Sequence, residues 1–157
     1  MSSASPKFKN PRARYNFQGR TCSITGVGSY VPSKVLTNAE LEKMVETSDE
    51  WIISRTGIQE RRIAGKNEFT SDLAAKAAES AMKMAGVIAG QIDLIIIATL
   101  TPDMPFPSTA CLVQRKLGAA RAAAFDMEAA CSGFIYALTI ADKFIRSGAA
   151  KRRTRCA

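Results

Sequence analysis

Residues 126–134, with the sequence DMEAACSGF, contain the side chain best suited to covalent chemistry, the thiol of Cys131. A short apolar run at 122–125 precedes this stretch, and a long apolar segment from about 132 to 147 follows it. The pattern predicts a buried strand, a tight turn and a buried helix, with Cys131 at the turn. At that position the positive end of the helix dipole and unpaired backbone N–H groups favour the thiolate, which is the nucleophile in thioester formation.

The local sequence leaves a second interpretation of Cys131 open. Free cysteines are commonly buried, so the alternative is a structural thiol inside the core. Of the other cysteines, we interpret Cys111 as a buried core thiol and assign no role to Cys22 or Cys156. Because no two cysteines form a C-x-x-C pair and the chain has no histidine, we expect no metal site.

The elements that must position Cys131 form an α/β pattern. Residues 94–98 (LIIIA) are continuously apolar and β-branched, which is typical of a strand buried on both faces of a parallel sheet. Pro102, Pro105 and Pro107 then predict an open loop at the carboxyl end of that strand, where ligands of α/β proteins gather. A helix over 108–117, closed by glycine, is expected after the loop.

A further helix is expected over residues 71–85. Alanines recur there every three or four residues and imply close packing of one helix face against a neighbouring element; they are Ala74, Ala77, Ala78, Ala81 and Ala85.

The amino-terminal part of the chain predicts smaller elements. Residues 22–30 predict a first strand that ends in a glycine turn, but Val31 stands where a dinucleotide-binding loop needs its third glycine. A capping box formed by Thr37 and Glu40 predicts a helix through about Glu46. A short helix over 49–54 and a short strand at 61–63 are expected next.

The charge distribution argues against a nucleic-acid partner, although the formal net charge is +8. Residues 1–20 carry five basic side chains and no acid, and residues 151–157 carry four basic side chains and no acid. The part between them therefore holds 13 basic and 14 acidic residues, and the basic excess is typical of solvated tails.

The length of 157 residues fits one domain, and an apolar content of 46% is enough for a sizeable core. No apolar run reaches membrane-spanning length and no signal-peptide pattern is present, so we expect a cytoplasmic protein without a membrane partner.

The two ends of the chain differ in character from its middle. We expect residues 1–20 to be a flexible basic extension and residues 21–150 to form the folded part. After the last helix an α/β chain needs a further strand, but residues 151–157 read KRRTRCA. This abrupt change predicts an aberrant basic tail on a truncated product of a longer protein.

Five motifs in order resemble the amino-terminal half of β-ketoacyl-[acyl-carrier-protein] synthase III, and the similarity runs from about residue 21 to about residue 151. They are GSYVP at 28–32, TSDEWI at 47–52, RTGI at 55–58 with Arg61-Arg62, FPS at 106–108 and DMEAACSGF at 126–134. The resemblance implies the α/β thiolase-like fold, layered αβαβα, of which this chain would supply the amino-terminal half.

The resemblance also implies roles for five side chains. Cys131 would accept an acyl group from coenzyme A, and Trp51 would stack on the adenine of coenzyme A, for which an indole face is well suited. Arg55 would lie near the coenzyme A phosphates and Thr47 near the same nucleotide. Phe106 would reach across a dimer into the partner's acyl pocket.

Each of the last four residues has a structural alternative. Trp51 would otherwise be a core aromatic, Arg55 a solvated helix charge, Thr47 a helix cap, and Phe106 a residue packed beneath the proline loop.

The implied reaction initiates type II fatty acid synthesis. Acyl-CoA and malonyl-acyl-carrier protein would give β-ketoacyl-acyl-carrier protein through an acyl-Cys131 intermediate, with acyl-CoA, acyl-carrier protein and a second copy of the full-length protein as partners. The coenzyme A thioester is a substrate in this scheme, and no cofactor is expected.

The family takes its donors for the developing oxyanion, a histidine and an asparagine, from its carboxyl-terminal half. Because this chain has no histidine, we predict that it does not condense. The alternatives are a non-catalytic fragment or interaction subunit, and a related thiolase-fold enzyme such as a polyketide starter synthase or a hydroxymethylglutaryl-type synthase.

Overall fold

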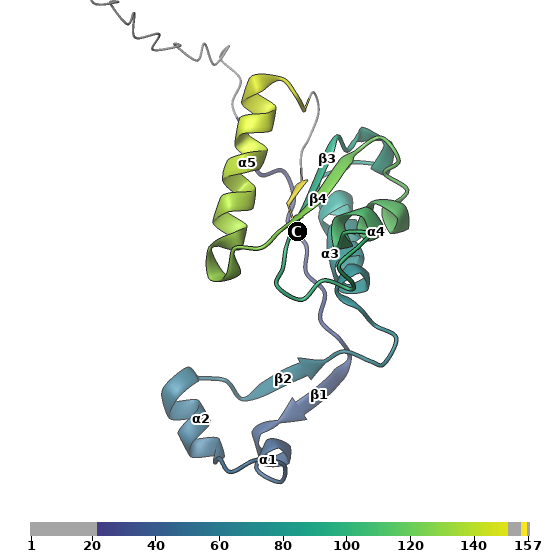
Figure 1. Cartoon of the computed structure of the whole chain (residues 1–157). Helices are drawn as coiled ribbons and strands as arrows, with labels where there is room; N and C mark the ends of the chain where they lie inside the picture. Colours follow the sequence, from purple (N-terminus) through teal and green to yellow (C-terminus); the bar gives the residue numbers. More distant parts are fainter. Residues whose placement is uncertain (1–21, 151–154, 157) are drawn as a thin grey trace, which may run out of the picture.

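The computed structural model describes residues 22–150 and 155–156 (Figure 1). The flexible extension predicted for residues 1–20 lies outside the described residues, as does most of the basic tail at 151–157.

A parallel sheet forms the centre of the main body. Its middle strand β3 (Leu94–Ala98) lies between β4 (Ala123–Met127) and the two-residue strand β5 (Arg155–Cys156). Both neighbours run parallel to β3. The strand predicted at 94–98 is confirmed with the expected bounds. The strand expected at 122–125 is present one or two residues further on, but it is half-buried rather than buried.

Helices cover both faces of this sheet. Helices α3 (Thr70–Met84) and α4 (Thr109–Leu117) lie on one face and α5 (Gly133–Ser147) on the other (Figure 1). A short 3-10 helix, Ala89–Gln91, connects α3 to β3. All three helices lie within a residue or two of their predicted bounds.

Alternate side chains of β3 enter two separate cores, because successive residues of a strand point to opposite faces. Ile95 and Ile97 pack beneath α3 and α4, whereas Leu94 and Ile96 pack beneath α5. All four are at least 96% buried, so the prediction of a strand buried on both faces is confirmed.

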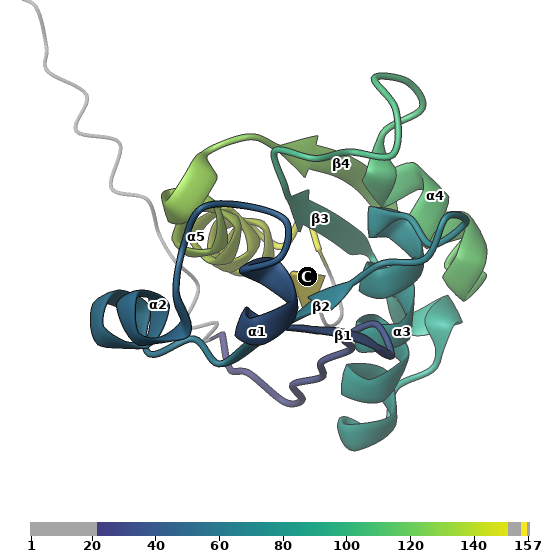
Figure 2. The same cartoon turned by 90° about the horizontal axis from the view of Figure 1, so that it is seen from below.

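A smaller lobe projects from the body (Figures 1 and 2). It contains an antiparallel pair, β1 (Lys34–Thr37) and β2 (Glu60–Ile63), with α1 (Asn38–Leu41) and α2 (Asp49–Thr56) between them. The short strand at 61–63 and the helix at 49–54 are confirmed, whereas β1 had no prediction.

The helix predicted from Thr37 to Glu46 is wrong in length. The capping box is present, because Glu40 N donates to Thr37 Oγ1 and Thr37 N donates to Glu40 Oε2, yet the helix ends at Leu41. Met44 and Val45 are more than half exposed, so no tertiary packing stabilises further helical turns.

The strand predicted at 22–30 is also wrong. Among the described residues no strand pairs with this segment, which crosses α3 instead. Gly26 and Gly28 lie directly against α3, where a Cβ on Gly28 would overlap the carbonyl oxygen of Ala77. The close approach predicted for the alanine face of α3 is therefore confirmed.

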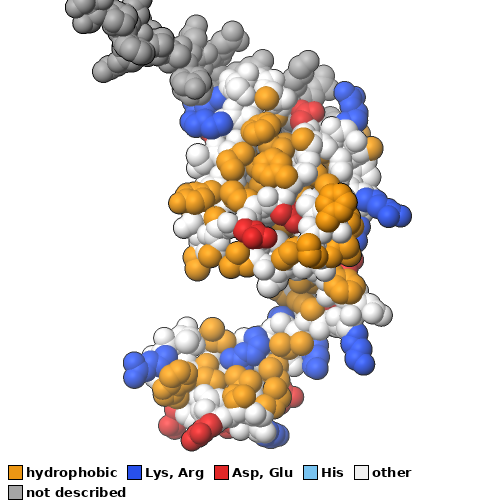
Figure 3. Space-filling view, viewed as in Figure 1, with side chains coloured by type: hydrophobic (Ala, Val, Ile, Leu, Met, Phe, Trp, Pro, Cys, Tyr) orange, Lys and Arg blue, Asp and Glu red, His pale blue; other side chains and the backbone are white. Residues whose placement is uncertain are grey.

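Two further expectations about burial are corrected by the structure. The apolar helix α5 is not enclosed within the described chain, because Phe134, Ile135 and Tyr136 are each more than half exposed. Figure 3 shows hydrophobic side chains gathered on this side of the body. Cys111 is half-buried rather than fully buried, with its Sγ 3.8 Å from the carbonyl oxygen of Ala124.

Candidate functional site

Cys131 lies at the turn between β4 and α5, as the sequence predicts. A 3-10 turn, Ala130–Ser132, joins the two elements, and Ala130 enters it with a left-handed φ of 43°. The Cys131 side chain is exposed. The alternative of a buried structural thiol is therefore wrong, and the sulfur is open to a reagent from solvent.

Gly133 holds this turn against the end of β3. It is the first residue of α5 and is buried, and a Cβ built on it would stand 3.1 Å from the Cβ of Ala98. The lack of a side chain at Gly133 thus lets α5 begin close to the sheet. The helix directs its N-terminal backbone N–H groups towards the turn that carries Cys131.

The loop after β3 lies at the same edge of the sheet as Cys131, because β3 and β4 are parallel and both end there. This loop, residues 99–108, carries Phe106, whose side chain is 88% exposed. The alternative that Phe106 packs locally beneath the prolines is wrong.

Asp126 fixes the far end of that loop, a role that the sequence motif around it does not predict. Its carboxylate accepts hydrogen bonds from the backbone N–H groups of Thr109 at 2.6 Å and Ala110 at 2.7 Å, at the start of α4. Ser108 caps the same helix through the N–H of Cys111. The available signal was a carboxylate at the end of an apolar strand, beside a helix start.

Helix α2 carries the residues predicted to contact a nucleotide. Trp51 is 58% exposed, so its alternative role as a core aromatic is wrong. Arg55 is exposed one helical turn later, on the same face, and has no ion-pair partner among the described residues. Exposure fits both the phosphate-binding interpretation of Arg55 and its alternative as a solvated charge.

Thr47 is half-buried and directly precedes the cap of α2. The cap is Ser48, whose hydroxyl accepts from the N–H of Trp51 at 3.1 Å, so the alternative role of Thr47 as the cap is wrong.

The candidate residues fall into two groups. Cys131 and Phe106 lie at the carboxyl edge of the sheet, whereas Thr47, Trp51 and Arg55 lie in the small lobe. The start of α5 faces this lobe, and α2 lies on the same side of the molecule as α5 (Figures 1 and 2). The thiol of Cys131 is thus exposed on the body. The indole of Trp51 and the guanidinium of Arg55 are exposed on the lobe that the start of α5 faces.

Two kinds of feature are absent from the described residues. No helix there is long and apolar enough to cross a bilayer. No group of three or more histidine, cysteine, aspartate or glutamate side chains there is placed to hold a metal ion.

The chain places an exposed cysteine between a strand of a parallel sheet and a covering helix, and the solved structures on which it superposes assign it to the thiolase-like class. The family model described as 3-oxoacyl-[acyl-carrier-protein (ACP)] synthase III matches residues 125–153, which include Cys131. β-Ketoacyl-[acyl-carrier-protein] synthase III of Thiobacillus denitrificans is 58% identical over 129 residues, covering 82% of this chain and 40% of that protein.

Solved structures agree with this result. The 3-oxoacyl-[acyl-carrier-protein] synthase III of Aquifex aeolicus superposes with a TM-score of 0.77 at 58% identity, covering 81% of this chain and 41% of that one. The priming β-ketosynthase of the R1128 polyketide pathway superposes with a TM-score of 0.78 at 38% identity, covering 81% of this chain and 38% of that one.

The resemblance to β-ketoacyl-[acyl-carrier-protein] synthase III is therefore confirmed, and the chain carries the amino-terminal half of that thiolase-like fold. It spans about 40% of the length of the curated relatives that it matches.

Proposed function

We propose that this chain carries the acyl-accepting part of a β-ketoacyl-[acyl-carrier-protein] synthase III. The observation that supports the proposal most strongly is the exposed thiol of Cys131 at the start of α5, inside the segment matched by the family model. In the proposed step the Cys131 thiolate attacks the thioester carbonyl of acyl-CoA. A new C–S bond to Cys131 forms, the C–S bond to coenzyme A breaks, and coenzyme A leaves as the thiolate.

Coenzyme A enters this scheme as part of the substrate, with no resident cofactor. The exposed indole of Trp51 offers a flat surface for adenine, and the exposed guanidinium of Arg55 suits a phosphate. Thr47 borders the same helix end. The exposed Phe106 supports a homodimer in which it enters the partner's acyl pocket.

Condensation with malonyl-acyl-carrier protein in the cytoplasm is proposed for a full-length protein only. That step needs donors placed where the enolate oxygen develops charge. The chain has no histidine to supply one, so we expect acylation of Cys131 without condensation.

Intact-mass measurement after incubation with acetyl-CoA tests the proposal. The chain should gain the mass of one acetyl group, and the Cys131→Ala variant should gain none. Cys22, Cys111 and Cys156 remain in that variant and report unspecific acylation. Equal labelling of the chain and the variant, or no labelling of either, would contradict an acyl-accepting Cys131.

A second candidate is a non-catalytic fragment that associates with another thiolase-fold subunit. The exposed apolar residues Phe134, Ile135 and Tyr136 of α5 favour it. A related polyketide starter synthase is a third candidate, supported by the similarity to the priming β-ketosynthase. Comparing Cys131 acylation from acetyl-CoA and from longer acyl-CoAs would separate the two enzymatic candidates.

A further inference from the structure

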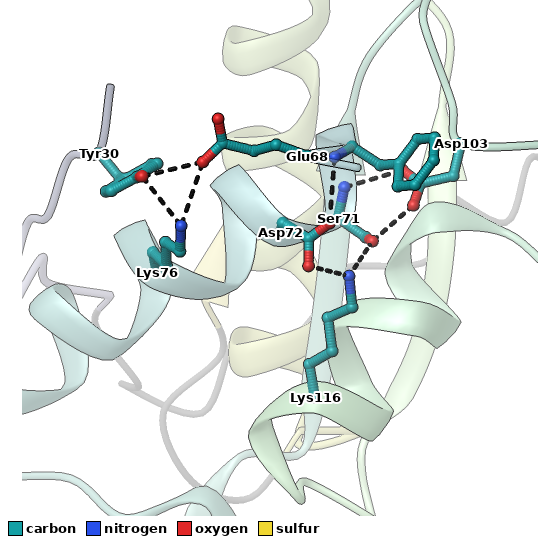
Figure 4. A network of polar contacts seen from close by, with 8 residues as sticks. Tyr30, Glu68, Ser71, Asp72, Lys76, Asp103 and Lys116 are labelled. Atoms are coloured by element: carbon teal, nitrogen blue, oxygen red, sulfur yellow. Dashed lines mark hydrogen bonds and ion pairs between the residues drawn. The ribbon is translucent and has the colours of Figure 1, made fainter. Parts of the chain in front are cut away.

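The loop that carries Phe106 is tied to the body through Asp103. The Asp103 carboxylate accepts from the backbone N–H of Ser71 at 2.8 Å and from the Ser71 hydroxyl at 2.5 Å (Figure 4). Lys116 Nζ donates to the same hydroxyl oxygen at 2.6 Å. These three side chains join the loop to the first turn of α3 and the last turn of α4.

Neighbouring contacts reinforce this connection. Lys116 Nζ also donates to Asp72 at 2.5 Å, and Asp72 accepts from the N–H of Phe69 at 3.0 Å. The hydroxyl of Thr70 donates to the carbonyl oxygen of Thr101 at 2.7 Å. The first turn of α3 thus holds the loop at two points.

A lysine beside a serine hydroxyl is also an arrangement that activates a nucleophile. Here Ser71 is 0% exposed, so no substrate reaches its oxygen. The cluster of Ser71, Asp103 and Lys116 therefore holds the loop in place and is not a second reaction centre.

The loop is fixed on both sides of Phe106. Asp103 holds it before this residue, and Asp126 and Ser108 hold the start of α4 after it. Only residues 104–107 lie between the two anchors, and within them Phe106 stands almost fully exposed. An exposed phenylalanine gains little from its own surroundings, so its direction depends on the anchors beside it.

We propose that Asp103, held by Ser71 and Lys116, is a positioning residue that fixes the direction in which Phe106 projects. The entry of Phe106 into a partner's acyl pocket rests on the proposed function. The anchoring of the loop by Asp103 does not depend on it.

Hydrogen exchange of the full chain tests the anchor, with Asp103→Ala compared with the unmodified chain. Exchange should rise on the order of tenfold in peptides that cover 69–72 and 99–108, while β3 keeps its protection. Asp142→Ala, which removes an aspartate paired with Arg146 on α5, is the matched control and should leave the loop unchanged. If Asp103→Ala does not fold, Asp103→Asn retains an acceptor for the Ser71 N–H and should show a smaller rise in the same peptides.

A fluorescent probe reports on position 106 itself. Because Trp51 is the only tryptophan, Trp51→Phe combined with Phe106→Trp gives one indole in the loop. The fast local depolarisation of this indole should increase when Asp103→Ala is added. It should stay near its starting value when Lys116→Arg is added instead, because that variant retains Asp103 and a cationic donor at position 116.

Unchanged loop exchange in the Asp103 variants, or an equal rise in β3, overturns the anchor. Failure of Cys131 acylation overturns the proposed function and leaves the exchange result as it stands.

Discussion

Cys131 is exposed although the residues before and after it in the sequence are mostly apolar. The turn explains this difference. Ala130 adopts a left-handed φ, and Gly133 brings α5 against Ala98, so the chain reverses with Cys131 on the outside. The sequence predicts the position of Cys131 between strand and helix. Its exposure depends on backbone angles that hydrophobic pattern does not encode.

Gly28 makes a comparable contact on the other side of the body and gives a first prediction at the scale of single residues. Because its missing Cβ leaves room for the backbone of Ala77, Gly28→Ala should lower the free energy of unfolding by about 1–3 kcal/mol. Urea denaturation would measure the change.

Gly65 is the matched control. A Cβ there would be 4.0 Å from its nearest neighbour, so Gly65→Ala should change stability by less than about 0.5 kcal/mol. Equal effects of the two substitutions would show that α3 does not require a glycine at position 28.

At the scale of elements, prediction from sequence works where one pattern decides the structure. The β-branched run of β3 and the alanine repeat of α3 each specify both an element and its buried side. The segment at 22–30 has a strand-like composition, but a strand also needs a hydrogen-bonded neighbour, and among the described residues none pairs with it. The helix at 38–41 shows the same limit, because a good cap does not replace packing.

Asp126 supports a second prediction, for helix α4. Thr109 and Ala110 are both fully buried, so Asp126→Ala leaves two N–H donors without their acceptor. The expected loss is about 1–3 kcal/mol of unfolding free energy. Asp126→Asn retains one acceptor oxygen and should lose less, and urea denaturation of the two variants would show the order. A stability for Asp126→Ala equal to that of the unmodified chain would rule out this capping role.

The contact between α3 and α4 gives a third prediction, which concerns pH. The hydrogen bond from Lys116 holds the pKa of Asp72 below its ordinary value of 3.8, with a smaller contribution from the N–H of Phe69. A carboxyl whose pKa is lower in the folded state stabilises the fold above its unfolded pKa. That stabilisation is lost as the pH falls through the folded value.

Lys116→Met should therefore be less stable than the unmodified chain at pH 6, and the difference should shrink as the pH falls below about 3.8. Thermal unfolding at several pH values would measure this difference in stability. Lys66→Met, a change at an exposed lysine, is the control. A difference that stays constant with pH would mean that Lys116 acts through Ser71 alone.

At the scale of the whole molecule, the sequence predicts the class of fold and the order of the main elements from α3 to α5, but not which surfaces stay open. The apolar character of α5 predicts an enclosed helix, but the structure buries the face where Ala137 and Ala141 meet β3 and leaves Phe134, Ile135 and Tyr136 exposed. The hydrophobic pattern of α5 does not specify which surface covers its exposed face. The separation of Trp51 and Arg55 from Cys131 likewise follows from how the lobe leaves the body, which no local motif specifies.

The open face of α5 gives the last prediction. Phe134, Ile135 and Tyr136 are consecutive, so they cover a wide arc of the helix, and exposed apolar surface of this kind binds hydrophobic dyes and promotes association. Ile135→Glu should reduce the fluorescence of a bound hydrophobic dye. It should also reduce the weight-average sedimentation coefficient, because fewer chains associate. It should cost less than about 0.5 kcal/mol of stability, because the side chain is already exposed. Ile88→Glu replaces an isoleucine outside α5 that is 69% exposed, compared with 59% for Ile135, and should leave both signals nearly unchanged. If the two variants behave alike, association depends on the total apolar surface of the chain and α5 has no particular part in it.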